Sequence, residues 1–575
     1  MAVDPCGNIA GVPAYAETSR ARRGCTTARI ARGNSTPESI GHAATSTDHT
    51  VVLLNGDADH PREILGNKGH GIEVMQRHGL PVPPAFCITT EVGLRYLAEP
   101  ATTLDAIWDD VLRRMKWLET VTSRTFGRGP RPLLVSVRSG ATLSMPGMMD
   151  TILNVGLNDD VVRALAASGT EKFAHDTRLR FTDMYQRIVG AASQSVPTDP
   201  YAQLRAGIEA VFASWNSPRA VAYRDHYGLD DRGGTAVVVQ AMVFGNLGAN
   251  SGAGACFSRN PITGANEPFG EWLPGGQGDD VVSGLVDVEP ITALRDEQPA
   301  VYQQLMDVAR TLERLGSDVQ EIEFTVEEGK LWLLQTRAAE RSAQAAVRLA
   351  LQLHHEGLID ATETLRRVTP AHVEALLLPA LQPEIRLAAP LLAKGLPACP
   401  GVVSGKAYTR VDEALEAADR GEQVILVRDH TRPEDVMGML AAHGIVTEIG
   451  GAASHAAVVS RELGRVAVVG CGNGVAATLA GKQITVDGYE GEVREGDLAP
   501  TSWSENDTPE LRELADLARR ISPLRAHAGG DHPRLADTAD ATVRAALDSG
   551  QTDVLSDSPL IVMLAALRSS SQATG

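Results

Sequence analysis

Aromatic residues, lysine and cysteine are all scarce in this chain of 575 residues. Aromatics make up only 4%, which argues against a surface that recognises nucleic acid by stacking its bases. The six cysteines are scattered and form neither a CxxC pair nor a Cys/His cluster. This pattern argues against a disulfide framework or structural zinc and favours a reducing, cytoplasmic compartment. No apolar run reaches the length of a membrane-spanning helix.

Positive charge is also in short supply, because the formal net charge is −19. A field of this sign repels nucleic acid and anionic membranes, so we expect neither as a partner. Only seven lysines occur, and arginine carries most of the positive charge. Any phosphate site must therefore be built locally. The apolar content of 43% supports ordinary hydrophobic cores, and the length is enough for roughly three or four domains.

The pattern along the chain predicts an α/β multidomain protein with five segments. Residues 1–48 show no periodicity and are predicted to be a disordered N-terminal extension. Residues 49–342 alternate glycine turns with strand and helix patterns, and residues 343–391 form a helical and proline-rich linker. Residues 392–498 form a compact α/β block. We expect residues 499–575 to be a low-order C-terminal tail without a core of its own.

One histidine lies where a glycine turn meets a helix, in the segment GGAASHAAVV (residues 450–459). The flanking apolar runs 445–449 and 466–469, with a helix over 456–463, predict a βαβ unit. Neutral imidazole is a nucleophile, and the helix N-terminus would favour a phosphate on His455. A lone histidine at a helix start is more often structural, so the rest of the chain must decide.

Three upstream segments have features of phosphate sites. The glycine-rich loop LGNKGHG (residues 65–71) carries Lys68, and Arg138 stands at the end of the predicted strand 133–137. Gly248, Gly252 and Gly254 lie between the predicted strands 236–243 and 255–258, which suggests a mobile hairpin flap over a nucleotide's phosphates. Taken singly, these segments are equally typical of a surface turn, an ion-pair partner and a flexible hairpin tip.

A second hairpin is predicted from residues 320–324 and 333–337 around the turn Glu328-Gly329. Side chains two residues apart share a strand face, so Glu321 and Glu323 point the same way, as do Gln335 and Arg337 on the partner strand. Paired carboxylates suit Mg²⁺, which shares its coordination with substrate phosphates. The alternative is an exposed ribbon with cross-strand ion pairs.

Together these segments resemble pyruvate, phosphate dikinase over about residues 50–498. The likeness rests on PLLVSVRSGATLSMPGMMDTILNVGLNDD (132–160), VFGNLGANSGAGACFSRNP (243–261), QEIEFTVEEGKLWLLQTR (320–337) and KGLPACPGVVSGKA (394–407). The segment GGAASHAAVVSRELG (450–464) is similar to the phosphohistidine motif of a wider group, which includes phosphoenolpyruvate synthase and rifampicin phosphotransferase. The SMPGMMDT stretch favours the dikinase.

The resemblance implies an ATP-grasp nucleotide-binding domain over 49–342 and a swivelling β/β/α phosphohistidine domain over 392–498. In such a protein, ATP and inorganic phosphate phosphorylate the histidine and release AMP and pyrophosphate, with Mg²⁺ as cofactor. His455 is the predicted catalytic residue, and Glu321 and Glu323 are the predicted metal ligands. The predicted ATP-binding residues are Lys68, Arg138, Gly248, Gly252, Gly254, Glu321, Glu323, Gln335 and Arg337.

Three departures from the family pattern bear on function. Glu321 stands where the family usually has aspartate, and Ala453 stands where many members carry a regulatory threonine. About 75 residues follow the histidine domain, whereas a (β/α)₈ barrel needs roughly 250. We therefore expect a short form without the phosphoenolpyruvate/pyruvate barrel.

The partners that this predicts are ATP, inorganic phosphate, a separate phosphoenolpyruvate/pyruvate-binding barrel protein and a second copy of the chain. Two alternatives stay open. The chain is an ATP-binding regulatory or scaffold protein without turnover, or it is a phosphotransferase with a different acceptor.

Overall fold

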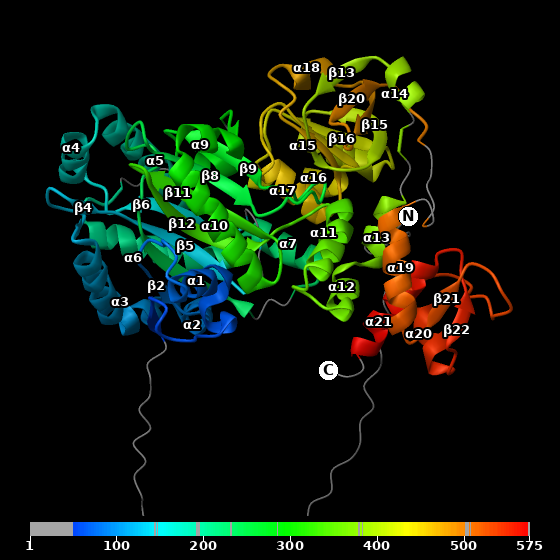
Figure 1. Ribbon diagram of the computed structural model, residues 1–575. Helices are drawn as coiled ribbons and strands as arrows, with labels where there is room; N and C mark the ends of the chain where they lie inside the picture. The colour runs from blue at the N-terminus through cyan, green and yellow to red at the C-terminus, as the bar shows by residue number, and fades with distance from the viewer. Residues whose placement is uncertain are drawn as a thin grey trace, which may run out of the picture. The chain divides into compact units, whose positions relative to one another are not determined.

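The computed structural model describes residues 50–142, 145, 148–190, 196–229, 233–283, 286–377, 380–381, 383–500, 505 and 508–572 (Figure 1). The extension predicted over residues 1–48 lies outside these residues. Helices and strands are mixed through every part of the described chain, which confirms the predicted α/β class. No helix in these ranges is long and apolar enough to cross a membrane.

A five-stranded antiparallel sheet begins the fold, with the order β1-β2-β7-β5-β6. Its strands are β1 (Val51–Leu54), β2 (Ala85–Ile88), β5 (Val135–Ala141), β6 (Thr151–Val155) and β7 (Thr235–Ala241). Alternate residues enter two different cores, because side chains of a strand point to opposite faces. Phe86 and Val239 join one core, and Cys87 and Val238 join the other. The sheet is therefore covered on both faces.

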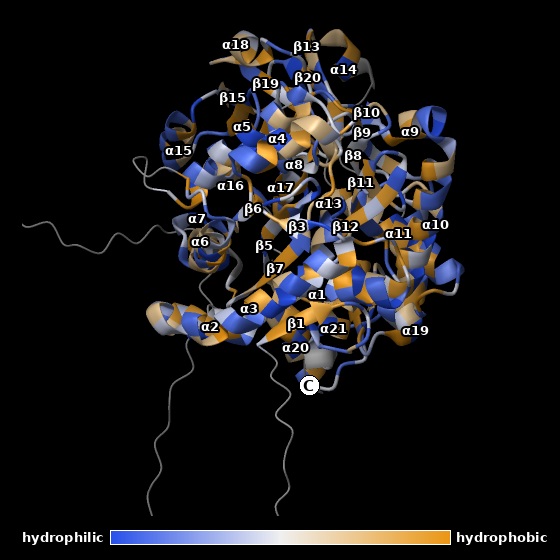
Figure 2. Cartoon of the chain, turned by 90° about the vertical axis from the view of Figure 1, so that its left-hand side faces the viewer, coloured by the Kyte–Doolittle hydropathy of each residue, from blue (hydrophilic) through white to orange (hydrophobic). Residues whose placement is uncertain are grey.

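The first of these cores is formed with a set of helices and short strands. They are α2 (Thr90–Ala98), α3 (Pro100–Thr122), β3 (Thr125–Phe126), β4 (Pro132–Leu133), α4 (Asp159–Ser168), α5 (Glu171–Ile188) and α6 (Pro200–Ala213). The 3₁₀ turn Ser214–Asn216 and α7 (Pro218–Tyr227) follow α6 and belong to a separate small core that includes Met148. Figure 2 shows orange and blue residues mixed along α3, as expected for a helix with one buried side.

A second five-stranded sheet has the order β10-β9-β8-β11-β12. Its strands are β8 (Gly252–Phe257), β9 (Phe269–Pro274), β10 (Glu289–Pro290), β11 (Gln320–Glu327) and β12 (Lys330–Ala338), with helices α8 (Gly278–Ser283), α9 (Ile291–Glu297) and α10 (Pro299–Gly316). Helix α1 (Arg62–Arg77) contacts both β5 and β12. Its Leu65 and Ile72 share a core with Val238 of the first sheet and Phe324 of the second. Helix α1 therefore links the two sheets.

An eight-stranded sheet forms the later part of the chain, with the order β13-β20-β19-β15-β16-β17-β18-β14. Its strands are β13 (Leu391–Lys394), β14 (Leu396–Cys399), β15 (Val402–Tyr408), β16 (Val424–Arg428), β17 (Gly444–Thr447), β18 (Val466–Val469), β19 (Gln483–Asp487) and β20 (Glu492–Glu495). The helices are α15 (Val411–Asp419), α16 (Val436–Ala441) after the 3₁₀ turn Pro433–Asp435, α17 (His455–Leu463) and α18 (Val475–Leu479). Strands β15 to β18 run parallel. The predicted βαβ unit is thus confirmed as β17-α17-β18, and Gly464, with a positive φ of 62°, caps the C-terminal end of α17.

The C-terminal segment is folded. Helix α19 (Pro509–Ile521), β21 (Arg525–His527), α20 (Asp540–Asp548), β22 (Asp553–Leu555) and α21 (Pro559–Gln572) follow the eight-stranded sheet. They share one core with the linker helices α11 (Ala343–His355), α12 (Ala361–Arg367) and α13 (Pro370–Leu376), whereas α14 (Pro383–Ala388) lies next to β13 in the chain. Leu514, Leu560 and Met563 are fully buried there. The prediction of a tail without a core is therefore wrong, because the linker helices supply the missing apolar surface.

Candidate functional site

A cavity of about 350 Å³ is lined by strands of both five-stranded sheets and by α1. Its polar side chains include Lys68, Arg138, Glu323, Gln335 and Arg337, together with the carboxylate of Asp279. Its apolar side chains include Met145, Met149, Leu153 and Met242. A cavity with one apolar part and a few converging charged groups is the usual form of a small-molecule site. The structure thus brings together five polar residues that the sequence pattern predicts.

Lys68 lies just after a break in helix α1. Gly66 has a φ of +66°, and a Cβ at this position would lie 1.7 Å from the carbonyl oxygen of Gly140. Only glycine therefore allows α1 to bend against β5 and to place Lys68 at the cavity. Burial and, to a lesser extent, the neighbouring Arg138 lower the pKa of Lys68 to about 7. Three cations around one cavity repel each other, so the site favours an anionic ligand.

The two arginines of the cavity are oriented by the hairpin of β11 and β12. Arg138 donates hydrogen bonds to Oε2 of Glu323 at 3.0 Å and to Oε1 of Gln335 at 3.1 Å. Arg337 donates to both carboxylate oxygens of Glu321, each at 3.0 Å. In the strand register, Glu321 is paired with Arg337 and Glu323 with Gln335. The predicted hairpin and its shared faces are confirmed.

The two predicted metal ligands lie in different surroundings. Glu323 lines the cavity, whereas Glu321 is absent from the cavity lining and is only 4% exposed. Because Arg337 holds both Glu321 oxygens, Glu321 acts here as the anchor of that arginine. Glu323 is therefore the better placed of the two to contact a cation in the cavity.

The glycines of residues 248–254 do not form the predicted hairpin. Strand β7 lies in the first sheet and β8 in the second, so the segment between them is a crossover. Gly252 and Gly254 are buried within β8, where a Cβ would lie 2.2 Å from Trp272 and 2.4 Å from the Glu271 carbonyl oxygen, respectively. They are needed for close packing of β8 on β9, not for mobility. Gly254 lines the cavity, and Gly248 and Gly252 do not.

His455 is the first residue of α17 and does not line the cavity. Its Nδ1 lies 3.0 Å from the hydroxyl oxygen of Thr431, while its buried Nε2 has no hydrogen-bond partner in the structure. Burial lowers the pKa of His455 to about 4, although Asp435 and Glu434 act in the opposite direction. The imidazole is therefore neutral at physiological pH, and Nε2 is the ring nitrogen without a hydrogen-bond partner.

The loop before His455 is held by two side chains that sequence reasoning missed. Glu271 of β9 accepts a hydrogen bond from the backbone N–H of Ala453 at 3.2 Å, and burial raises the pKa of Glu271 to about 7. Arg461 donates to the carbonyl oxygen of Ala452 at 2.8 Å. A Cβ on Gly451 would lie 1.8 Å from Glu271 Oε1, so the contact requires glycine.

Comparison with known proteins identifies two domains. Residues 106–305 match the family model of the pyruvate phosphate dikinase AMP/ATP-binding domain. Residues 421–491 match the model of the mobile domain of PEP-utilising enzymes. The first range contains Arg138 and the β8 glycines, and the second contains Thr431 and His455. Glu323, Gln335 and Arg337 lie beyond the C-terminal end of the first range, and Lys68 lies before it.

Curated relatives extend the likeness across most of the chain. The pyruvate, phosphate dikinase of Clostridium symbiosum is 38% identical over 538 residues, which cover 84% of this chain and 61% of the relative. The chloroplastic pyruvate, phosphate dikinase 1 of Oryza sativa subsp. japonica is 37% identical over 83% of this chain and 56% of its own length. The enzyme of Rhizobium meliloti (strain 1021) is 38% identical over 80% of this chain and 59% of its own length.

The chain therefore spans about three fifths of the length of the curated relatives it matches. An NMR structure of an Enzyme I protein matches 17% of the chain at 29% identity, with a TM-score of 0.12 that carries no information on the fold. Over its ATP-binding and mobile domains, the chain is similar to the pyruvate, phosphate dikinases.

Proposed function

We propose that this protein is a pyruvate, phosphate dikinase-type phosphotransferase that uses ATP and inorganic phosphate to phosphorylate His455. The observation that carries the proposal is the convergence of Lys68, Arg138 and Arg337 on one cavity with an apolar part. Phosphates of ATP would neutralise the three cations, and the apolar part would take the base. The lowered pKa of Lys68 is consistent with this, because burial and the neighbouring arginines disfavour the charged amine, which a bound phosphate would stabilise.

Mg²⁺ fits this cavity as a cofactor shared with the nucleotide. Among the described residues, the only cluster of three or more His, Cys, Asp or Glu donors that could hold an ion lies elsewhere, so Glu323 would supply a protein ligand while phosphate and water oxygens supply others. When bound, the ion would neutralise charge on the phosphates. Glu321 joins only if Arg337 releases one of its oxygens.

The geometry of His455 favours Nε2 as the nucleophile. When Nδ1–H donates to the hydroxyl oxygen of Thr431, the ring is oriented and Nε2 keeps the lone pair that attacks. In the proposed step, Nε2 forms a bond to the β-phosphorus of ATP, and the bond from that phosphorus to the AMP oxygen breaks. Inorganic phosphate then takes the γ-phosphoryl group as pyrophosphate, which leaves phosphohistidine. His455 must reach the cavity for this, so the domain over residues 392–498 has to move.

Transfer from His455 to pyruvate is the second half of the proposed reaction. We propose that this half uses a phosphoenolpyruvate/pyruvate-binding barrel on a separate polypeptide. The homodimer and the cytoplasmic location stay predictions, and some relatives are chloroplastic.

Labelling with [β-³²P]ATP tests the first half-reaction. With Mg²⁺ and inorganic phosphate, the protein should gain acid-labile, base-stable label and release AMP and pyrophosphate. His455→Ala should abolish the label. His443→Ala is the matched control, because His443 is a second partly buried histidine of the same domain whose pKa burial also lowers.

Three outcomes separate the possibilities. Label that persists in His455→Ala would overturn the assignment of the carrier residue. ATP binding without AMP release would favour a regulatory or scaffold protein. Label that forms but is not discharged to pyruvate, with or without a separate barrel protein, would favour a different acceptor. NMR of the phosphorylated protein would identify Nε2 or Nδ1 as the modified nitrogen.

A further inference from the structure

The C-terminal segment holds a group of potential metal ligands that lies outside the proposed phosphoryl-transfer chemistry. Strands β21 and β22 pair in parallel, with Arg525 opposite Asp553 and Ala526 opposite Val554. Ala526 and Val554 are fully buried in the core shared with the linker helices. Because strand side chains alternate, Arg525, His527 and Asp553 lie on the other face of this two-stranded sheet.

The loop after β21 returns a second histidine to the same face. Gly530 has a φ of +125°, a conformation that other residues rarely adopt. The backbone N–H of Leu555 donates to the carbonyl oxygen of Pro533 at 2.8 Å, and that of Leu535 donates to the carbonyl oxygen of Leu555 at 3.0 Å. These bonds fix the loop on β22. The His532 ring stacks on the His527 ring with centroids 4.6 Å apart.

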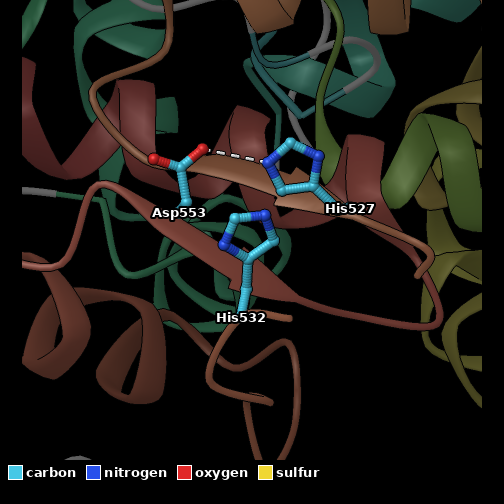
Figure 3. Close-up of side chains that lie close together, drawn as sticks. All are labelled: His527, His532 and Asp553. Carbon is cyan, nitrogen blue, oxygen red and sulfur yellow. Dashed lines mark hydrogen bonds and ion pairs between the residues drawn. The ribbon is translucent and has the colours of Figure 1, made fainter. Parts of the chain in front are cut away.

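Two imidazoles and one carboxylate therefore converge from three points of the chain (Figure 3). The ligand atoms of His527, His532 and Asp553 all lie within 4.8 Å of one another, and this is the one such group of three among the described residues. Tetrahedral ligands at about 2.0–2.2 Å from a zinc ion lie roughly 3.3–3.6 Å from each other, so small side-chain shifts would bring these three atoms into ligand positions. We propose that His527, His532 and Asp553 form a binding site for a divalent transition-metal ion of the Zn²⁺ class.

Arg525 holds both oxygens of the Asp553 carboxylate, as Arg337 does for Glu321. However, Oδ1 of Asp553 also faces Nε2 of His527, and an ion would bind on that side. Arg525 donates to Oδ1 of Asp553 at 2.9 Å and to Oδ2 at 2.7 Å, and Thr552 donates to Oδ2 at 2.9 Å. These bonds, led by that from Arg525 and joined by one from His527, hold the pKa of Asp553 well below its ordinary value. The group is thus a carboxylate in a fixed orientation. Outer partners of this kind commonly orient metal ligands.

The ligand types select the class of ion. Imidazole nitrogen suits zinc and its first-row neighbours, whereas Mg²⁺ prefers oxygen ligands throughout. In the structure, Nε2 of His527 lies 3.0 Å from Oδ1 of Asp553. An ion between these atoms would replace that hydrogen bond with two coordinate bonds, and His532 would supply the third. Three protein ligands leave at least one position for water or another small ligand.

Zinc titration of the full-length protein tests the site. Metal is first removed with a chelator, and Zn²⁺ is then titrated against a chromophoric competitor with Mg²⁺ in excess, which keeps oxygen-ligand sites filled. We expect one Zn²⁺ equivalent whose affinity falls by at least about 100-fold in His527→Ala, His532→Ala and Asp553→Asn, because loss of a direct ligand should exceed the effect of losing an outer partner. Co²⁺ should give visible absorption bands that the same variants lack.

Two further variants keep the test decisive. His532→Cys should retain the tight equivalent, because a thiolate also binds zinc, and a merely structural histidine would not be replaced in this way. His78→Ala removes a histidine outside the cluster and should leave the titration unchanged. The proposal is overturned if the wild-type protein binds no equivalent that the three variants lose, or if His78→Ala loses it as well. The result does not depend on ATP or on His455.

Discussion

Lys68 is the residue whose ionisation most directly reports the occupant of the cavity. Burial and the adjacent Arg138 lower its pKa to about 7, and Glu323 only partly offsets this. A bound polyphosphate would favour the protonated amine and raise its pKa. Linkage then requires that binding and protonation strengthen each other. At pH values above 7, the free protein must take up a proton at Lys68 in order to bind ATP tightly.

We therefore predict that the Kd for ATP rises with pH above 7.5. The sign follows because the free amine is mostly neutral there and the bound amine is charged. The rise should approach about tenfold per pH unit until the pKa of the bound amine is reached. Isothermal titration calorimetry from pH 7.5 to 9.5 measures it, in a range where phosphate groups with a second pKa of about 6 are already ionised.

Lys68→Met should weaken ATP binding at pH 7.5 and flatten this pH dependence. Lys330→Met is the control, because Lys330 lies over the Trp332 ring, does not line the cavity, and has the same side-chain charge. An equal pH slope in wild type and Lys68→Met would contradict the prediction and would assign the titration to another group.

At the residue scale, the sequence predicted the positions of side chains correctly where a family-like motif lies on a hairpin with a single strand register. Glu323, Gln335 and Arg337 could be placed because strand alternation and one hairpin register fix them. It could not separate the roles of Glu321 and Glu323, because both lie on the same face of β11 and only packing shows which one reaches the cavity. The sequence did not indicate Thr431 or Glu271 as site residues, because both are distant from His455 in the chain. Thr431 contacts the histidine from the loop after β16, and Glu271 contacts the preceding loop from β9 of the second sheet. The only feature in the sequence that could have indicated them is a polar residue shortly after a predicted strand, for Thr431, and a charged residue within a largely apolar strand, for Glu271.

Helix α1 is the element that couples the fold to the cavity. Its break at Gly66 lets residues 62–65 and 67–77 take different directions, so that Leu65 enters the core while Lys68 reaches the cavity. Gly66 also lies against Gly140 of β5. The small residues on both sides allow the helix and the strand to approach closely.

We predict that Gly66→Ala lowers the free energy of unfolding of the part that contains the first two sheets by clearly more than about 1 kcal/mol. Alanine at this position would have both an unfavourable positive φ and a clash with the backbone of Gly140. It should also weaken ATP binding, since Lys68 moves with the helix. The melting temperature and the Kd for ATP measure the two effects. Gly79→Ala is a close control, because Gly79 has a φ of +67° and nothing within 4 Å of the added Cβ. Equal losses in the two variants would show that the contact with Gly140 is unimportant.

The predictions of helices and strands were most successful where the spacing of apolar residues was regular. The βαβ unit around His455 and the apolar face of α11 follow from spacing alone. The crossover from β7 to β8 was mistaken for a hairpin, because two strands joined by glycines look the same whether they pair with each other or enter separate sheets. Only the side-chain partners of β8, such as Trp272 and Phe324, distinguish the two cases.

At the scale of the whole molecule, one core joins segments that are separated by the entire eight-stranded sheet. Val347 and Leu351 of α11 share it with Leu514 of α19 and Met563 of α21. Arg348 also pairs with Glu510 at 2.9 Å. Neither segment could be recognised as a domain from its own sequence, because each carries only part of the apolar surface. The described C-terminal residues therefore stabilise the linker between the ATP-binding and mobile domains.

We predict that Leu514→Ala loosens both segments at once. Removing a fully buried leucine typically costs about 2–5 kcal/mol, because a cavity remains where the side chain packed. Amide hydrogen exchange should therefore accelerate over residues 343–376 as well as over 508–566, while the first two sheets stay protected. Leu179→Ala, at a leucine that is 56% exposed, should change neither region. Faster exchange confined to residues 508–566 would instead mean that the C-terminal segment folds independently of the linker helices. Joint loosening would show that the linker owes its order to a part of the chain that carries none of the proposed ATP or histidine chemistry.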